Sequence, residues 1–61
     1  TPDTLASLNN LAFSYQGMHE MSTALALFEE ALEGARGALG DQHSVTRKFE
    51  DNLRRARLTR S

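Results

Sequence analysis

Two apolar stripes at helical spacing constrain this chain more than any other feature of its sequence. On a helix that turns about 100° per residue, the members of each stripe share one side. The first stripe consists of Leu5, Leu8, Leu11, Ala12 and Tyr15. The second consists of Met21, Ala24, Leu25, Leu27, Phe28, Ala31, Leu32, Ala35, Ala38 and Leu39. Both stripes mix small and large side chains, which lets two backbones approach while the large side chains fill the remaining space. The pattern predicts an antiparallel helix pair.

Start and stop signals for helices divide the chain into three predicted helices, at residues 2–16, 20–39 and 45–59. Thr1 is expected to cap the first helix and Gly17 to end it. Gly40 is expected to end the second helix, and Ser44, or alternatively Asp41, to cap the third. The predicted fold class is therefore all-α, a helix hairpin followed by a third helix.

The spacing within the two stripes also matches a known repeat. It reads Leu8-x2-Leu11-Ala12-x2-Tyr15, then Ala24-x3-Phe28 and Ala31. This spacing resembles the tetratricopeptide (TPR) repeat, a helix-turn-helix unit of α-solenoids. Three positions depart from the family pattern, because Leu8 stands where Trp is usual, Ala12 where Gly is usual, and Arg36 where Pro is frequent. The absence of Pro at position 36 indicates that the second helix is longer than in the shorter variety of the TPR repeat.

A longer variety of the repeat gives a better likeness. The segments Pro2-Asp3-Thr4-Leu5 and Leu8-Asn9-Asn10-Leu11-Ala12 resemble the repeats of kinesin light chains, and the likeness covers residues 1 to about 41. The chain also echoes itself at an offset of 42 residues, in the pairs Thr4 and Thr46, Asn10 and Asn52, and Leu11 and Leu53. The echo indicates that the third helix begins a second, partial copy of the unit.

The third helix carries only part of the apolar pattern. Val45, Phe49, Leu53 and Ala56 share one narrow side. Charged residues replace the other apolar face, since Arg47, Glu50 and Arg54 stand at the positions of Leu5, Leu8 and Ala12. A helix with a single apolar face cannot be sandwiched between two neighbours. We therefore expect it to be the polar capping helix at the C-terminal end of a repeat array.

The resemblance also implies candidate binding residues on the first helix, away from its apolar stripe. They are Ala6, Asn9, Asn10, Phe13 and Gln16. In TPR proteins the equivalent side lines a concave groove that receives peptides, and asparagines there often hold the main chain of the ligand. By this resemblance Asn9 and Gln16 are expected to form hydrogen bonds, followed by Asn10, and Phe13 to make apolar contact. An alternative for Phe13 is packing against the second helix of a preceding repeat, with the amides facing water.

Charge is unevenly distributed along the chain. Residues 1–41 carry six acidic residues and one arginine, a net charge of −5, whereas residues 42–61 carry six basic and two acidic residues, a net charge of +4. A cluster of basic side chains could bind RNA, an anionic membrane or an acidic partner protein. However, Glu50 precedes Arg54, and Asp51 precedes Arg55, by four residues, which favours ion pairs within a solvated helix. The sequence thus favours neither nucleic acid nor a membrane as a partner.

The sequence contains few residues or motifs that would predict catalysis or metal binding. Glu29, Glu30 and Glu33 are expected to face solvent on the outer side of the second helix. His19 and His43 lie about 24 residues apart in a chain without cysteine, which is not metal-ligand spacing. No phosphate-binding loop or nucleophile motif is present in the sequence. We expect no enzymatic activity, no cofactor and no metal site.

Length and composition fit one small module. A chain of 61 residues can bury only about 60% of the surface that its unfolded form exposes. It has no apolar run near the roughly 20 residues needed to span a bilayer, no signal-peptide pattern and no cysteine, so we expect a soluble, cytoplasmic protein. Because it begins Thr1-Pro2-Asp3 without Met, we also expect it to be a piece of a longer protein.

These patterns support three functional hypotheses. The leading one is a protein-interaction module at the end of a TPR array, whose partners are upstream repeats and a protein or peptide ligand. The alternative is a structural element that caps the array, or that forms a homo-oligomer through its exposed repeat face. A third hypothesis, an adaptor for nucleic acid or membrane through the basic helix, has the least support.

Overall fold

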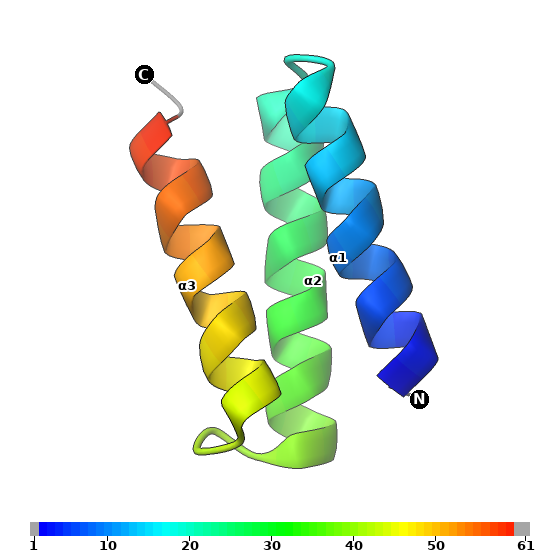
Figure 1. The fold of residues 1–61 in the computed structure, drawn as a ribbon, viewed down its shortest axis with the longest axis vertical. Coiled ribbons are helices and arrows are strands. Elements are labelled where there is room, and N and C mark those ends of the chain that lie inside the picture. The colour runs from blue at the N-terminus through cyan, green and yellow to red at the C-terminus, as the bar shows by residue number, and fades with distance from the viewer. Residues whose placement is uncertain (1, 60–61) are drawn as a thin grey trace.

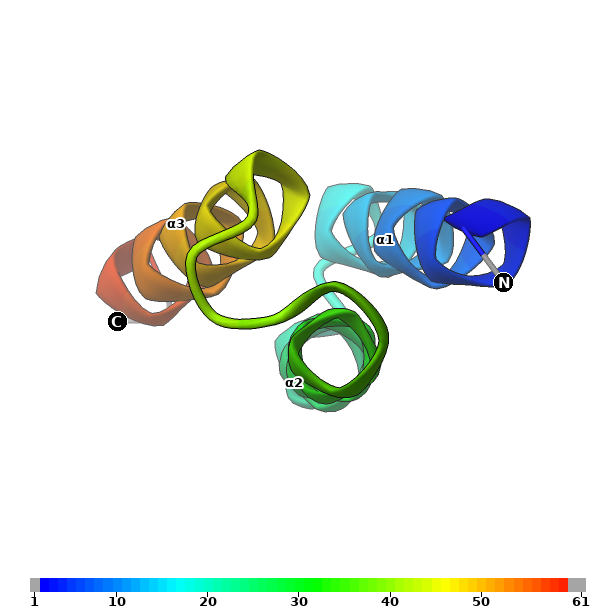
Figure 2. The same ribbon diagram turned by 90° about the horizontal axis from the view of Figure 1, so that it is seen from below.

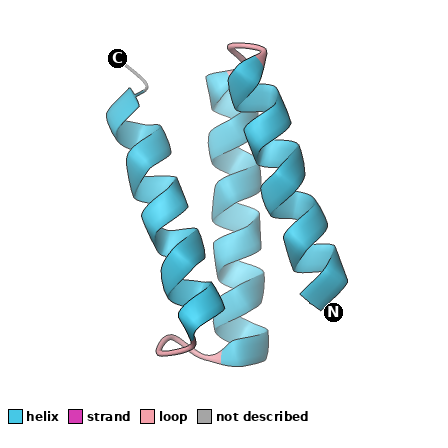
Figure 3. Ribbon diagram, in the orientation of Figure 1, coloured by secondary structure: helices cyan, strands magenta, loops and turns pink. Residues whose placement is uncertain are grey.

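The computed structural model describes residues 2–59, which form three helices (Figures 1 and 3). Helix α1 spans Pro2–Gly17, α2 spans Met21–Leu39 and α3 spans Ser44–Thr59. Successive helices run in opposite directions, and short connections join them (Figure 1). The prediction of an all-α fold with three packed helices is confirmed. The expected cap at Thr1 lies outside the described residues.

Helix α2 is the centre of the fold. Seen from below, α1 and α3 lie side by side over one face of α2 (Figure 2). Both helices pack against α2, and the contact between α1 and α2 is the more extensive. Direct contact between α1 and α3 is much smaller, so each of these two helices is held mainly by its packing against α2 (Figure 2). This arrangement positions the candidate site described in the next section.

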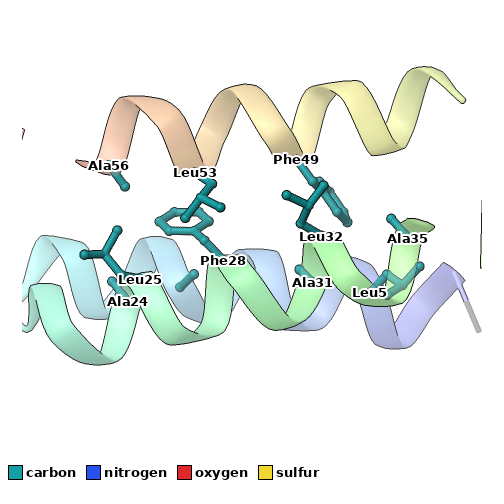
Figure 4. Close-up of a cluster of buried hydrophobic side chains, with 11 residues drawn as sticks. Leu5, Ala24, Leu25, Phe28, Ala31, Leu32, Ala35, Phe49, Leu53 and Ala56 are labelled. Atoms are coloured by element: carbon teal, nitrogen blue, oxygen red, sulfur yellow. The ribbon is translucent and has the colours of Figure 1, made fainter. Parts of the chain in front are cut away.

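The core lies along both sides of α2. Its buried members are Leu5 and Ala12 from α1, Ala24, Leu25, Phe28, Ala31, Leu32 and Ala35 from α2, and Phe49, Leu53 and Ala56 from α3. Figure 4 shows that Phe49 and Leu53 point toward α2. Nearly half of the buried residues are alanines, which allow close approach of the helix backbones, while Phe28 fills the space at the centre. The core therefore depends on the small residues of both predicted stripes.

Two members of the predicted stripes are not in the core. The side chain of Leu11 is 46% exposed, and Ala38 is also exposed. Leu8 and Tyr15 are only half-buried, whereas Asn9, which lies outside the predicted stripe, is buried. The buried arc of α1 is thus rotated toward Asn9, because α3 covers that side of the helix as well as α2. Spacing within α1 alone carries no information about this second contact.

The turn after α1 depends on a histidine. The N–H of Glu20 donates to the carbonyl of Tyr15 at 2.9 Å, and the N–H of His19 donates to the carbonyl of Gln16 at 3.1 Å. This pair of hydrogen bonds is the Schellman arrangement that ends many helices, in which the residue with positive φ is usually glycine. Here His19 takes that place with φ of 63°, and Gly17 is the last residue of the helix.

A glycine and a second histidine organise the connection between α2 and α3. Gly40 has φ of 88°, and its N–H donates to the carbonyl of Arg36 at 3.1 Å, closing α2 as expected. The start of α3 differs from the prediction, because the helix includes Ser44 and His43 is the residue before it. The Nδ1 atom of His43 accepts a hydrogen bond from the N–H of Val45 at 3.1 Å. His43 therefore caps the helix, a role that the sequence had suggested for Ser44 or Asp41.

Candidate functional site

A cleft of about 450 Å³ opens between the N-terminal halves of α1 and α3. It is lined by Leu5, Ala6, Asn9 and Asn10 from α1, Leu39 from the end of α2, His43 from the connection, and Val45, Lys48 and Phe49 from α3. Figure 2 shows these ends of α1 and α3 facing the viewer, with the connection that follows α2 between them. The cleft thus combines side chains from all three helices.

The cleft includes three of the five candidate residues from the sequence. Ala6, Asn9 and Asn10 line it, because they lie one turn or less apart on the side of α1 that turns toward α3. Phe13 and Gln16 are not among its lining residues. They lie further along α1, beyond the half of the helix that forms the wall of the cleft.

Phe13 packs against the core of its own unit. Its ring meets the ring of Phe28 edge to face, with centroids 5.1 Å apart and an interplanar angle of 83°. Phe28 is buried, whereas the side chain of Phe13 remains 47% exposed. Neither of the two interpretations that the sequence offered for Phe13 included this contact. The ring stabilises Phe28 and presents its other surface to solvent.

Asn9 already has a partner within the chain. The Nδ2 atom of Asn52 in α3 donates a hydrogen bond to Oδ1 of Asn9 at 3.3 Å. Asn9 is 9% exposed, so the amide links two helices at the base of the cleft instead of facing solvent. Asn10 is exposed on the same wall and offers a donor and an acceptor at the rim. The structure therefore favours Asn10 over Asn9 for direct contact with a ligand.

Several residues of the site were not candidates in the sequence. Asn52 could have been found from the internal echo, because it matches Asn10 at the 42-residue offset. Val45, Lys48 and Phe49 carry no local signal for a site, since they become neighbours of α1 only when α3 folds back along α2. Leu39, the last residue of α2, likewise becomes a neighbour of the first half of α1 only through the fold.

The cleft is apolar inside and polar at its rim. Leu5 and Phe49 are buried core residues whose side chains also line it. Lys48 supplies a positive charge that forms no ion pair with any residue in the range 2–59. An apolar interior with a few polar groups around it is the usual chemistry of a site that binds an organic ligand or a peptide side chain.

The hollow between α2 and α3 has a different character. It has a volume of about 470 Å³, and its charged lining residues are Glu29, Glu33, Arg36, Glu50, Arg54 and Arg57. Arg36 lies 3.6 Å from both Asp41 and Glu50, and Arg57 lies 3.2 Å from Glu29. These charges neutralise one another across the helix contact, so the hollow offers no unpaired charge to a ligand.

Ion pairs within α3 agree with the sequence analysis. Arg54 lies 3.7 Å from Glu50, and Arg55 lies 3.0 Å from Asp51, as the four-residue spacing predicted. Together with Arg57, which pairs with Glu29, these arginines account for three of the five basic residues in the described part of the basic segment, residues 42–59. The basic segment is mostly engaged in pairs, which is the interpretation favoured above over a phosphate-binding surface.

Residues 2–59 contain neither a metal-binding cluster nor a membrane-spanning helix. In the range 2–59, no three histidine, aspartate or glutamate side chains are grouped in a way that could hold a metal ion. None of the helices described in the structure combines the length and the apolar character needed to cross a membrane.

Comparison with known proteins identifies the repeat. Residues 4–44, well over half of the chain, match the family model described as tetratricopeptide repeat, of the kinesin light chain type. Comparisons with curated proteins and with solved structures gave no significant match. Repeats of this family generally act as protein–protein interaction modules and are typically non-catalytic. The match covers α1, α2 and the connection that follows them, and the chain belongs to the tetratricopeptide repeat family.

Proposed function

We propose that this chain forms the end of a TPR array and that the cleft between α1 and α3 contributes to a concave surface that binds an extended peptide of a partner protein. One observation carries the proposal: Ala6, Asn9 and Asn10, three of the five α1 residues selected by resemblance to the family, line a cleft together with side chains from α3. These three residues lie within about one turn of α1, and the fold places all three at the cleft.

The chemistry of the cleft suits a peptide. The exposed amide of Asn10 can donate to a carbonyl and accept from an N–H, so it can pair with main-chain groups whatever the sequence of the ligand. The apolar interior next to Leu5 and Phe49 can receive one side chain of that ligand. The remaining binding free energy would come from preceding repeats, so we expect this chain alone to bind weakly.

The outer surface of α3 supports a position at the end of the array. Seven of its 16 residues are charged, namely Arg47, Lys48, Glu50, Asp51, Arg54, Arg55 and Arg57. Most of these side chains are exposed, whereas Thr46, Phe49, Leu53 and Ala56 face α2. Another helix stacked on this outer surface would have to desolvate several charges, which is costly. A polar terminal helix is what repeat proteins use to remain soluble.

Nuclear magnetic resonance on the isolated chain tests this proposal. A library of random peptides is first selected for binding to the 61-residue chain, and the selected peptides are then titrated against isotope-labelled protein. We expect shifted signals to concentrate at the lining residues of the cleft. Asn10→Ala should lower affinity about threefold to tenfold, the value of one lost hydrogen bond.

Ser14→Ala is the matched control, because Ser14 is an exposed polar residue on the same helix but does not line the cleft. Its affinity should equal that of the parent. The proposal is rejected when selected peptides shift signals of the α2–α3 hollow instead, or when both substitutions weaken binding equally.

A further inference from the structure

The start of α3 depends on a hydrogen bond that only a neutral histidine can make. The Nδ1 atom of His43 accepts this bond from the N–H of Val45 at 3.1 Å. A backbone N–H can only donate, so Nδ1 carries no proton and the proton of the neutral ring lies on Nε2. Protonation of the ring places an N–H at Nδ1, and two donors then face each other. The imidazolium form of His43 therefore cannot cap the helix.

A positive charge at this position is also unfavourable for the helix. The N-terminus of a helix carries a partial positive charge, which repels a cation. Arg47 and Lys48 add two further positive charges near the start of α3, and neither forms an ion pair with any residue in the range 2–59. Protonation of His43 would thus add a third cation to a segment that is already positive.

The neighbouring elements do not compensate for this added charge. The α1 residues that line the cleft with His43 are uncharged, as is Leu39 at the end of α2. Asp3 is exposed in the first turn of α1 and is not among the lining residues of the cleft. Asp41 is close to His43 in the sequence, but its carboxylate lies 3.6 Å from Nε of Arg36. The charges around His43 therefore do not offset the loss of its hydrogen bond.

The first turn of α3 has little to hold it apart from the cap. The buried apolar side chains of α3 begin at Phe49, since Val45 is only half-buried. Thr46 is buried in this turn, but its Oγ1 has no hydrogen-bond partner among the described residues, so exposure to water would relieve a cost. Loss of the cap is therefore expected to unwind the first turn of α3, while the packing from Phe49 onward remains.

This turn forms part of the cleft. His43 lines the cleft together with Val45, Lys48 and Phe49, and these three residues form its α3 wall. Unwinding of the first turn would displace Val45 and Lys48 from that wall. The same turn thus connects the protonation state of His43 to the shape of the cleft.

We propose that His43 is a pH-sensitive cap, whose protonation uncaps α3 and loosens the α3 wall of the cleft. The contribution of the cap to stability is fully present when the imidazole is neutral. It is lost as the pH falls through the range in which histidine gains a proton, between about pH 8 and pH 5. The effect on ligand binding rests on the proposed function of the cleft, whereas the uncapping of α3 does not.

Thermal unfolding at about pH 8 and about pH 5.5 tests the cap. The melting temperature of the parent should fall by about 4–8 °C on acidification, the shift expected when a small domain loses one helix cap. His43→Asn should remove most of this fall, because asparagine is a good cap that does not titrate. His43→Ala should already melt lower than the parent by a similar amount at the higher pH, and should fall little further.

His19→Asn is the matched control, because it removes the other histidine of the sequence, and asparagine tolerates the left-handed conformation of His19. It should retain the fall seen in the parent. The α-amino group titrates in the same range, but all variants share it. Equal falls in His43→Asn and His19→Asn would overturn the proposal. Equal melting temperatures of His43→Ala and the parent at the higher pH would also overturn it.

Chemical shifts separate the uncapping of α3 from its effect on the cleft. On acidification, the Cα shifts of Val45 and Arg47 should move toward unfolded values in the parent and not in His43→Asn, while those of Leu53 stay helical. A selected peptide without ionisable side chains should bind the parent more weakly at the lower pH and bind His43→Asn equally at both. An unchanged affinity for the parent, despite the shifts in α3, would reject the effect on the cleft. Absence of any peptide binding at the higher pH would instead reject the proposed function, and the melting temperatures would still decide whether His43 is the cap.

Discussion

The side-chain amides of Asn9 and Asn52 join α1 to α3 on the side of α2 that both helices cover. Nδ2 of Asn52 donates a hydrogen bond to Oδ1 of Asn9 at 3.3 Å, between residues 43 positions apart in sequence. Asn9 is buried and Asn52 is half-buried, so water competes poorly for this bond. Since α1 and α3 otherwise share little contact, we expect the amide pair to help hold the two walls of the cleft together.

A double-mutant cycle should measure this pair. Asn9→Ala and Asn52→Ala are each expected to lower the free energy of unfolding by about 1 kcal/mol, because each leaves the other amide with a poorly solvated, unpaired group. The double variant should cost about 1 kcal/mol less than the sum of the two single variants. Urea unfolding followed by circular dichroism gives all four free energies. Strict additivity would show that the two amides do not interact in solution.

The sequence predicted the fold because the apolar stripes and their small residues are local signals. Ala12, Ala24 and Ala31 are all fully buried, as expected for positions where helix backbones approach. Leu11 was assigned wrongly to the core, because the period of one helix defines an apolar arc without saying which part of it a neighbour covers. The position of the third helix decides this, and that position depends on long-range packing.

The candidate site could be predicted only in part, for the same reason. Residues on one turn of α1, Ala6, Asn9 and Asn10, reach the cleft together because a helix keeps them on one side. Phe13 and Gln16 follow the same pattern in sequence but lie too far along the helix to line it. The opposite wall, with Lys48 and Phe49, is set by how α3 folds back on α2, which spacing within α1 does not encode.

Glycines 34 and 37 in α2 should respond differently to replacement by alanine. A Cβ atom at Gly37 meets nothing within 4 Å, so Gly37→Ala should raise the free energy of unfolding by about 1 kcal/mol through helix propensity. A Cβ atom at Gly34 would lie 2.5 Å from Cδ2 of Leu5, which is a buried side chain. Gly34→Ala should therefore yield little or no gain, because Leu5 must move.

The shorter side chain of Leu5→Val provides the control for the glycine comparison. It lacks the Cδ2 atom, so Gly34→Ala made in that background should recover most of the gain seen at Gly37. Thermal or urea unfolding of the matched variants measures each difference. If Gly34→Ala already equals Gly37→Ala in the parent chain, Leu5 moves without cost and the contact does not constrain the helix pair.

His19 should be replaceable by glycine with a gain in stability. With φ of 63°, His19 occupies a left-handed conformation that costs a residue with a Cβ atom roughly 1 kcal/mol relative to glycine. His19→Gly should therefore raise the free energy of unfolding by about that amount. Gly17→Ala should also be stabilising, by a smaller amount, because Gly17 is the last residue of α1 and a Cβ atom added there meets nothing within 4 Å. Destabilisation by His19→Gly would show that the imidazole makes interactions that outweigh the backbone strain.

Thr46 offers the clearest test of buried polarity in this fold. Its side chain is fully buried at the start of α3, and Oγ1 has no hydrogen-bond partner among the described residues. Valine has nearly the same shape and a similar helix propensity, so Thr46→Val removes an unpaired hydroxyl and adds an apolar methyl group. The free energy of unfolding should rise by about 1 kcal/mol.

The matched substitution Thr46→Ser separates the hydroxyl from the methyl group of this residue. Serine keeps the hydroxyl and loses the buried methyl, so it should lower the free energy of unfolding by about 1 kcal/mol through lost packing. The order of stability is then expected to be valine, threonine and serine, measured by urea unfolding. If valine is less stable than threonine, the hydroxyl has a hydrogen-bond partner in solution. In that case the match between Thr46 and Thr4 at the 42-residue offset reflects a structural requirement for the hydroxyl in α3.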